Sequence, residues 1–510
     1  MKVVENVLSE KRRIISMRRF FIENAGRSRC FSYLCRVRRT NLNAHEYENI
    51  ENFSCRASDI RFCGGAQNKG GIDPKMLGEL RDSYKNTAED KALRNALAGT
   101  DIQKLASNAD VSAEVDGYFS HRVPTKGITD QESSGRCWLF SGLNVLRAKM
   151  MAEHHLPECE FSQAYCFFYD QLEKANLFLQ GVIDTRSLPM DDQTVAWLFK
   201  NPLSDGGQFT GVSDIIGKYG LVPREVMNET YSTNNTARIA FLIKLKLREY
   251  GLRLRELPAK AKPAEIDKMK TEMLSTIYRM LALAFGEPPT EFTWTRKDKK
   301  GNPIETKIYT PKSFYDEFIG DDLTGGYVMV MNDPSRPYYK LYEIDYDRHM
   351  YDGYNWTYIN LPVEDIKPLA IASIKDSTAM YFSCDVAKFL DSKKGTLDLR
   401  NYDYESLMGT TFGMDKKQRI QTFASGSSHA MTLVGVDLDE KGMPKKWLIE
   451  NSWGATSGYK GFLIMTDDWF DEYMFRLVVE KKYVPQNILD ILRQKPTLLP
   501  AWDPMFAEDK

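Results

Sequence analysis

The sequence predicts an α+β fold in which helices precede strands along the chain. Before about residue 285, apolar residues recur at helical spacing in several segments, whereas after residue 325 short apolar runs alternate with turn residues. The chain has 510 residues, of which 42% are apolar and 12% aromatic, so it can fill the cores of two or three domains. Helices and strands that are segregated along a chain are typical of α+β proteins.

The composition excludes several classes of protein. The 69 basic and 70 acidic residues nearly cancel, so the overall charge indicates neither nucleic acid, nor a membrane surface, nor a polyanionic substrate. The eight cysteines are irregularly spaced and form no CxxC pair, which argues against a disulfide scaffold, a zinc site and a redox motif and favours a reducing compartment. No window approaches 18 uninterrupted apolar residues, so we predict no membrane span.

Residues 1–67 differ in composition from the rest of the chain. Residues 1–66 hold 13 Lys and Arg against 7 acidic residues, and four of the eight cysteines. Arginine clusters at 17–21 and 36–39 are compatible with a targeting segment, although a secretory signal would need a longer apolar stretch. Composition favours a disordered or mis-started extension, and a basic arm that touches nucleic acid is a third interpretation. We expect the folded body to begin near residue 68.

Helices and one hairpin are predicted in the first part of the folded body. They are a polar helical stretch from a turn at 70–74 to about 106, a helix that begins at Cys137 and reaches past Met151, a helical pair over 233–285 broken at 258–263, and a hairpin over 292–309. The lysine-bearing hairpin tip at 300–303 either lines a charged cavity or is an ordinary solvated turn.

Strands are predicted in the last third of the chain. They cover 327–331, 339–344, 368–374, 379–384, 430–437, 446–450 and 461–465, with a turn at 440–442. No internal repeat of 20–50 residues is apparent.

Cys137 is the candidate nucleophile. A thiol attacks a carbonyl well only as its thiolate, which a helix N-terminus or a nearby imidazolium favours, and Cys137 opens a predicted helix. Gln131 lies six residues upstream on a loop that can fold back beside the sulfur, so it is a candidate donor to an oxyanion. Cys166 and Cys384 stand in aromatic surroundings and are expected in the core.

His429 is the candidate general base. It follows the small residues Ser425–Ser428 and begins a predicted strand, which places an imidazole at a strand end beside a cleft. His154 and His155 fall at a helix end, where capping or exposure is expected. The other histidines of the chain are His45, His121 and His349.

Asn451 is the candidate group that orients the histidine. It lies 22 residues after His429, one strand, turn and strand later, so it can return to the same side of the sheet. Trp453 can shield the pair from water. A buried cysteine, a lone histidine or an asparagine in a turn is usually structural when taken singly. Together with Gln131 they fill each role that a thiol acyl-transfer site requires.

Three motifs resemble the papain superfamily, and specifically its bleomycin hydrolase and aminopeptidase C branch. They are Gly135–Trp138, His429–Met431 and Glu450–Gly454. The arginine before the cysteine, the Leu499–Met505 ending and the separation of 292 residues between cysteine and histidine all resemble that branch. Ordinary papain-like enzymes separate the two residues by about 130–150 positions.

The resemblance implies a papain-like α+β fold with a helical half that carries the cysteine helix and an antiparallel β-barrel half, plus helical and hairpin insertions. It implies these divisions: 1–67 extension, 68–232 helical half, 233–325 insertion, 326–485 β-rich half, and 486–510 a C-terminal arm that reaches the cleft. It also implies a homohexamer and a cytoplasmic location. Gly206 and Gly207 resemble the family's glycine pair on the cleft wall, and the alternative is a simple turn.

The function expected from these residues is that of a cysteine aminopeptidase that needs no metal or organic cofactor. The arm's carboxylate would meet the substrate's free amine and block longer chains. The tail ends at Lys510 instead of the family's small residues, so its site is the weakest prediction; Trp453 completes the substrate-binding set. An endopeptidase, an acyl transferase and a non-enzymatic scaffold are the alternatives, and the side-chain preference and physiological substrate do not follow from the sequence.

Overall fold

The structure is a computed structural model that describes residues 70–111 and 115–505. The predictions for residues 1–67 and for Lys510 lie outside the described residues. The chain divides into two compact units, residues 1–86 and 87–510. In the first unit, helix α2 (Pro74–Ser83) begins at the Asp73 cap, whose carboxylate accepts from Met76 N–H. No helix among the described residues is both long and apolar enough for a membrane crossing.

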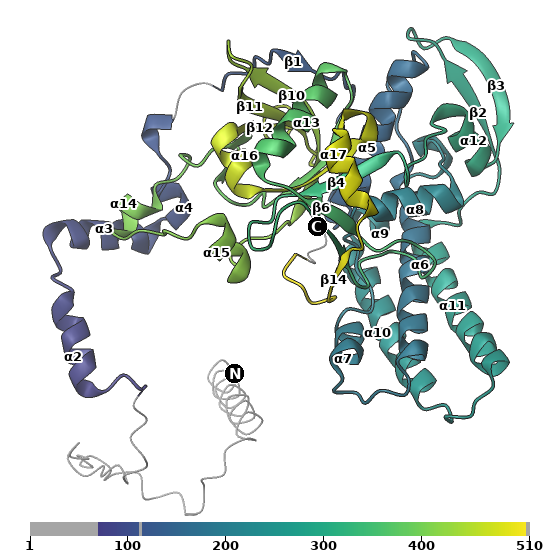
Figure 1. Cartoon of the computed structure of the whole chain (residues 1–510), viewed down its shortest axis with the longest axis horizontal. Coiled ribbons are helices and arrows are strands. Elements are labelled where there is room, and N and C mark those ends of the chain that lie inside the picture. The colour runs from purple at the N-terminus through teal and green to yellow at the C-terminus, as the bar shows by residue number, and fades with distance from the viewer. Residues whose placement is uncertain (1–69, 112–114, 506–510) are drawn as a thin grey trace, which may run out of the picture. The chain divides into compact units, whose positions relative to one another are not determined.

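The second unit begins with a mainly helical part. The helix predicted at Cys137 is confirmed, as is the helical pair that is broken near residue 260. The two helices of this pair, α10 and α11, pack along the long helix α6 (Figure 1). The elements are α3 (Ala88–Gly99), α4 (Ile102–Leu105), η1 (Ala109–Val111), α5 (Cys137–Glu153), α6 (Gln163–Asp184), α7 (Gln193–Lys200), α8 (Phe209–Tyr219), η2 (Arg224–Val226), α9 (Tyr231–Asn234), α10 (Thr236–Arg255), α11 (Pro263–Phe285) and α12 (Pro311–Phe318).

A twelve-stranded sheet follows, in the order β14-β5-β6-β4-β13-β7-β10-β11-β12-β9-β8, with β1 beside β10. Most pairs are antiparallel, while β4–β6, β9–β12 and β5–β14 are parallel. The strands are β1 (His121–Arg122), β4 (Tyr327–Met331), β5 (Lys340–Ile344), β6 (Thr357–Asn360), β7 (Met380–Cys384), β8 (Leu390–Asp391), β9 (Thr396–Leu397), β10 (His429–Leu438), β11 (Pro444–Glu450), β12 (Phe462–Thr466), β13 (Met474–Glu480) and β14 (Thr497–Leu499).

The predicted hairpin is confirmed as a separate sheet of β2 (Phe292–Lys297) and β3 (Pro303–Tyr309). Lys300 and Gly301 at its tip are exposed, which fits the interpretation as an ordinary solvated turn.

The strand predicted at 368–374 is wrong. This segment belongs to helix α13 (Val363–Lys375), which contains Pro368. The helix buries Ile366, Leu369, Ala370 and Ile374 against the sheet, at the spacing of three and four residues that marks one helical face. The remaining late helices are α14 (Tyr404–Met408), α15 (Lys416–Gln421), α16 (Asp467–Tyr473), η3 (Lys481–Tyr483), α17 (Gln486–Leu489) and η4 (Asp490–Arg493).

Helix α5 joins the helical part to the sheet, because it packs against β10 and β7. A buried ion pair fastens this contact: Arg147 Nη2 of α5 lies 2.7 Å from Glu450 Oε1 at the end of β11. Burial raises the pKa of Glu450, and Arg147 opposes that shift. Breaking one partner of such a buried pair typically costs about 3–5 kcal/mol. The pair therefore ties the helix that begins at Cys137 to the strand that precedes Asn451.

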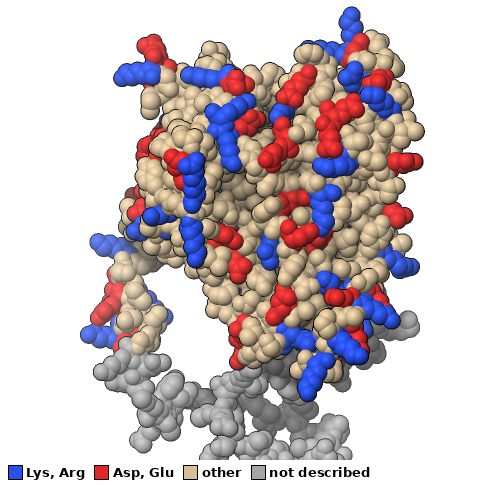
Figure 2. Space-filling model, turned by 45° about the vertical axis from the view of Figure 1, so that its right-hand side comes forward, with Lys and Arg blue, Asp and Glu red and all other residues tan. Residues whose placement is uncertain are grey.

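The face that Figure 2 shows carries Lys and Arg side chains interspersed with Asp and Glu side chains. Interspersed charges of both signs produce no large field of one sign on this face.

Candidate active site

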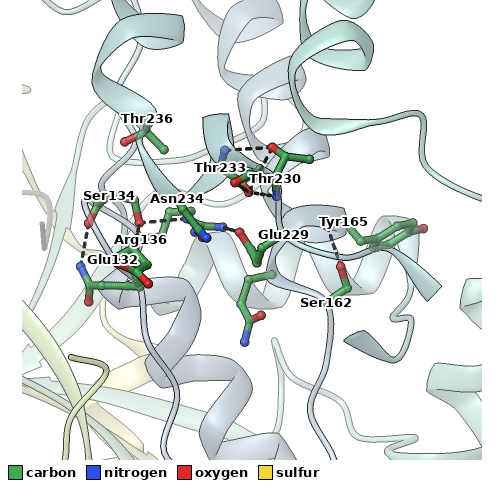
Figure 3. A network of polar contacts seen from close by, with 12 residues as sticks. Glu132, Ser134, Arg136, Ser162, Tyr165, Glu229, Thr230, Thr233, Asn234 and Thr236 are labelled. Atoms are coloured by element: carbon green, nitrogen blue, oxygen red, sulfur yellow. Dashed lines mark hydrogen bonds and ion pairs between the residues drawn. The ribbon is translucent and has the colours of Figure 1, made fainter. Parts of the chain in front are cut away.

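Helix α5 begins at a firmly held loop. Arg136, directly before Cys137, has no exposed surface, and its Nη1 lies 2.8 Å from Glu229 Oε2 (Figure 3). Its Nε–H donates to Ser134 Oγ at 3.0 Å, and its guanidinium lies over the rings of Phe140 and Phe167. Burial lowers the pKa of Arg136, while Glu229 raises it. The ion pair and the rings hold the turn from which the helix starts.

Cys137 is the first residue of α5 and is fully buried. Its Sγ accepts a hydrogen bond from Ala430 N–H at 3.4 Å. The sulfur therefore lies against the beginning of β10, next to His429, although 292 residues separate the two in sequence. The positive end of the α5 dipole favours negative charge on this sulfur.

His429 and Asn451 meet across neighbouring strands. The β10–β11 register pairs Thr432 with Glu450, which brings the residue after β11 back to the start of β10. His429 Nε2 lies 2.8 Å from Asn451 Oδ1, and Ser452 N–H donates to the same oxygen at 2.8 Å. Because this oxygen accepts, Nε2 carries the proton in the neutral ring and the lone pair is on Nδ1. The Trp453 ring stacks on the imidazole, 4.8 Å between centroids.

Gln131 is anchored to both sides of the site. Its Oε1 accepts from Ser452 Oγ–H at 2.7 Å, and its backbone N–H donates to Ser452 O at 2.9 Å. Its Nε2 donates one N–H to Ser134 O at 2.7 Å. A side-chain amide has two N–H groups, so one donor remains for another acceptor. The structure thus brings Gln131, Cys137, His429 and Asn451 into one region.

Gly206 and Gly207 lie on the loop before α8, behind the first turn of α5. Gly206 O accepts from Lys174 Nζ at 2.5 Å. A Cβ added to Gly207 would stand 2.2 Å from His349 Cε1 and 2.8 Å from Trp138 Cε2. The missing side chain therefore makes room for these two rings, a structural reason that a simple turn does not supply.

His349 is a buried histidine that the sequence did not single out. Its Nδ1 lies 2.5 Å from Asp170 Oδ1, and its Nε2 accepts from Gln208 N–H at 3.4 Å. Its ring makes an edge contact with Trp138, 4.6 Å between centroids. The partners come from separate segments, so only the spacing of Asp170 and Lys174, one turn apart on α6, could have indicated a polar cluster here.

The C-terminal arm reaches this side of the molecule. Strand β14 pairs with β5, and the residues that follow it line a cavity of about 660 Å³ together with residues directly before His429. The lining includes Ser204, Ser427, Ser428, Ala501, Trp502, Asp503 and Pro504. Among the residues that the structure describes, no group of three or more His, Cys, Asp or Glu side chains is placed to hold a metal ion.

Known proteins resemble this chain over most of its length. Residues 71–506 match the Peptidase C1-like family. The chain belongs to this family. It is 41% identical to human bleomycin hydrolase over 76% of this chain and 88% of the human protein. It is 37% identical to aminopeptidase C of Lactobacillus delbrueckii subsp. lactis over 81% of this chain and 93% of that protein.

A solved structure of the Peptidase C1-like family extends the likeness to the fold. The crystal structure of PepW from Lactobacillus rhamnosis superposes with a TM-score of 0.82 at 36% identity, over 86% of this chain and 100% of that one. The predicted α+β papain-like fold, the recognised family and the class of cysteine peptidase are therefore confirmed.

Proposed function

We propose that the protein removes N-terminal residues from peptides by thioester chemistry, with Cys137 as nucleophile. The Cys137 thiolate attacks the scissile carbonyl, and His429 Nδ1–H then protonates the leaving amine. The backbone N–H of Cys137 and the second N–H of Gln131 stabilise the oxyanion. Water hydrolyses the thioester with His429 as base, which restores the thiol.

The observation that carries this proposal is the contact of the two chain segments at the sulfur. The Cys137 sulfur lies on the first peptide of the strand that His429 begins, while Asn451 holds the far side of the imidazole at 2.8 Å. This arrangement leaves Nδ1 as the ring nitrogen that exchanges protons with the thiol and the leaving group.

The restriction to peptides with a free N-terminus would come from the C-terminal arm. Arm residues 501–504 form part of the cavity wall beside Ser427 and Ser428, so a long substrate approaching from that side would meet the arm. The name of one relative, aminopeptidase C, supports an exopeptidase. Gly206, Gly207 and Trp453 are the substrate-contacting residues in this proposal. The homohexamer and the cytoplasmic location are part of it as well.

The test compares free and N-acetylated aminoacyl substrates that release a fluorogenic amine, in the presence of reductant. We expect the wild type to turn over the free substrates only, and Cys137→Ala to be inactive. Cys159→Ala is the matched control, because it removes a free thiol outside the site and should keep activity. Turnover of the N-acetylated substrates would indicate an endopeptidase. Transfer of the acyl group from the thioester to an added amine would indicate an acyl transferase. If no substrate is turned over, the protein would be a non-enzymatic scaffold.

The hexamer is tested by light scattering after size exclusion, which would give six times the 58.6 kDa chain mass. A monomer with full activity would contradict this part of the proposal alone.

A further inference from the structure

We propose that the C-terminal arm is held in place by a two-point latch, Arg336 on Asp503 and Arg476 on the carbonyl of Met505, and that this latch sets how strictly the enzyme requires a free N-terminus. The inference rests on the proposed function, because the arm is assigned there as the restricting element. It adds the residues that decide whether the arm stays docked.

The first point of the latch is an ion pair. Arg336 Nη2 lies 3.0 and 3.1 Å from the two carboxylate oxygens of Asp503. Both side chains are largely shielded from water, at 15% and 9% exposure. A pair this shielded is weakly screened by salt, so it contributes more than an exposed pair. Burial lowers the pKa of Arg336, but the surrounding acidic groups raise it overall, so the guanidinium stays charged.

Arg336 is also held by residues that do not belong to the arm. Its Nε lies 2.6 Å from Asp333 Oδ2. The buried Asn360 of β6 donates to the carbonyl oxygens of Asp333 and Arg336 at 2.9 and 3.2 Å and accepts from Asp333 N–H. The sheet therefore presents the guanidinium in a set position. A receptor that is already ordered loses little entropy when the arm binds.

The second point lies two residues further along the arm. Arg476, on the central strand β13, has no exposed surface, and its Nη2 donates to Met505 O at 2.9 Å. Met505 is itself 1% exposed, and its N–H donates to Asp503 Oδ1 at 2.9 Å. The Asp503 carboxylate thus joins the two points. A buried guanidinium that loses an acceptor is costly, which favours the docked arm.

The stretch of arm in front of the latch has few buried contacts. Leu498 is 62% exposed and Trp502 is 43% exposed, while Ala501 is buried. The strand β14 contributes three residues of parallel pairing to an edge of the sheet. Ala501, Met505 and the partly buried Leu499 supply a small apolar anchor. The ion pair and the buried carbonyl contact add to this anchor, and a segment with few buried contacts opens locally at low cost.

The test measures two quantities on the full chain: the ratio of turnover of N-acetylated to free aminoacyl substrates, and hydrogen exchange of the peptide that covers residues 497–505. Arg336→Gln and Asp503→Asn each remove the ion pair while keeping polar side chains. We expect the ratio to rise about fivefold to thirtyfold in each, which corresponds to the loss of about 1–2 kcal/mol. Exchange of 497–505 should accelerate while that of β10 stays unchanged.

Three comparisons make the result decisive. The double variant should show no further rise, because the two residues act through each other. Arg400→Gln, which breaks an Arg–Asp pair at the exposed Arg400, should leave both quantities unchanged.

A chain truncated after Leu498 sets the upper limit of the ratio. If truncation raises the ratio and the latch variants do not, the latch is wrong and the proposed function stands. If truncation has no effect, the arm does not restrict the cleft. Faster exchange in the latch variants would then show that the latch still holds the arm.

Discussion

Two histidines of this protein are both buried beside a tryptophan ring, but their hydrogen-bond partners differ in charge. His429 and His349 are 1% and 2% exposed, and each lies against a tryptophan ring. His429 contacts the neutral amide of Asn451 at 2.8 Å, whereas His349 contacts the carboxylate of Asp170 at 2.5 Å. A carboxylate favours one charge state of the imidazole, while an amide orients the ring and favours neither as strongly.

The charge of the partner distinguishes the two rings: we assign proton exchange to His429 and support of the neighbouring loop to His349. In the proposed mechanism, His429, which lies beside the sulfur of Cys137, gains and loses a proton in each turnover. His349 fills the space that the glycines at 207 and 211 leave, behind the first turn of α5. Burial next to an aromatic ring is therefore no indication of catalysis by itself; the partner's charge and access to the reacting atom are what distinguish the two.

The largest effect is expected from removing each ring. His429→Ala should lower kcat by about 10³-fold or more, because no group then accepts or returns the proton. His349→Ala should lower kcat less than about tenfold and raise KM, since the loop at 206–208 loses its support. Steady-state kinetics on a free aminoacyl substrate measure both. Equal losses of kcat in the two variants would contradict the division of roles.

The second test gives His429 a carboxylate partner, as His349 has. Asn451→Asp keeps an acceptor for Nε2–H and adds a charge that stabilises the imidazolium. We expect the alkaline limb of the pH–rate profile to move up by about one unit, because that limb reports loss of the imidazolium proton. We also expect kcat to fall about tenfold, because hydrolysis of the thioester needs the neutral ring. Asn451→Ala is the control, in which activity falls and the limb does not move up.

The reverse exchange gives His349 an amide. Burial would raise the pKa of Asp170, but Lys174 and His349 lower it below its usual value. Asp170→Asn leaves Lys174 without its charged partner, so unfolding free energy should fall by about 3 kcal/mol near neutral pH. The folded state binds the proton of Asp170 more weakly than the unfolded state does. The wild-type advantage is therefore complete above about pH 5 and shrinks as pH falls through the usual carboxyl pKa. Urea unfolding at several pH values measures this.

The last prediction concerns a buried lysine whose three hydrogen bonds go to neutral oxygens. Lys416 Nζ donates to Asn332 Oδ1, Met474 O and Asp471 O, at 2.6, 2.6 and 3.0 Å. Burial lowers its pKa to about 7. Between pH 7 and 10 the unfolded chain binds this proton and the folded chain does not, so wild-type stability should rise with pH. Lys416→Met should lack this rise. If the unfolding free energies of the two proteins changed with pH in parallel, Lys416 would be charged in the folded protein over this whole pH range.

Much of the fold and of the candidate site could be predicted, for reasons that differ between segments. The helix at Cys137 and the strands around His429 and Asn451 follow from local periodicity, which neighbouring residues determine. The sequence predicts a strand over 368–374, in the part of the chain where strands dominate. The helix forms all the same, because its apolar face over Ile366–Ile374 packs on the sheet.

What could not be predicted depends on partners that are distant in sequence. The pairs Arg147–Glu450 and Arg336–Asp503 join residues 303 and 167 positions apart. The role of His349 depends on space left by Gly207 on a distant loop and by Gly211 in α8. Charged residues on predicted helices and strands are usually solvated, so nothing local distinguishes these from surface residues.

The bond between Arg147 and Glu450 also has a consequence for how the protein is made. Glu450 lies nearly nine-tenths of the way along the chain, so helix α5 cannot be fastened to strand β11 until that much of the chain has been synthesised. A nascent or fragmentary chain therefore carries an isolated thiol without its proton acceptor.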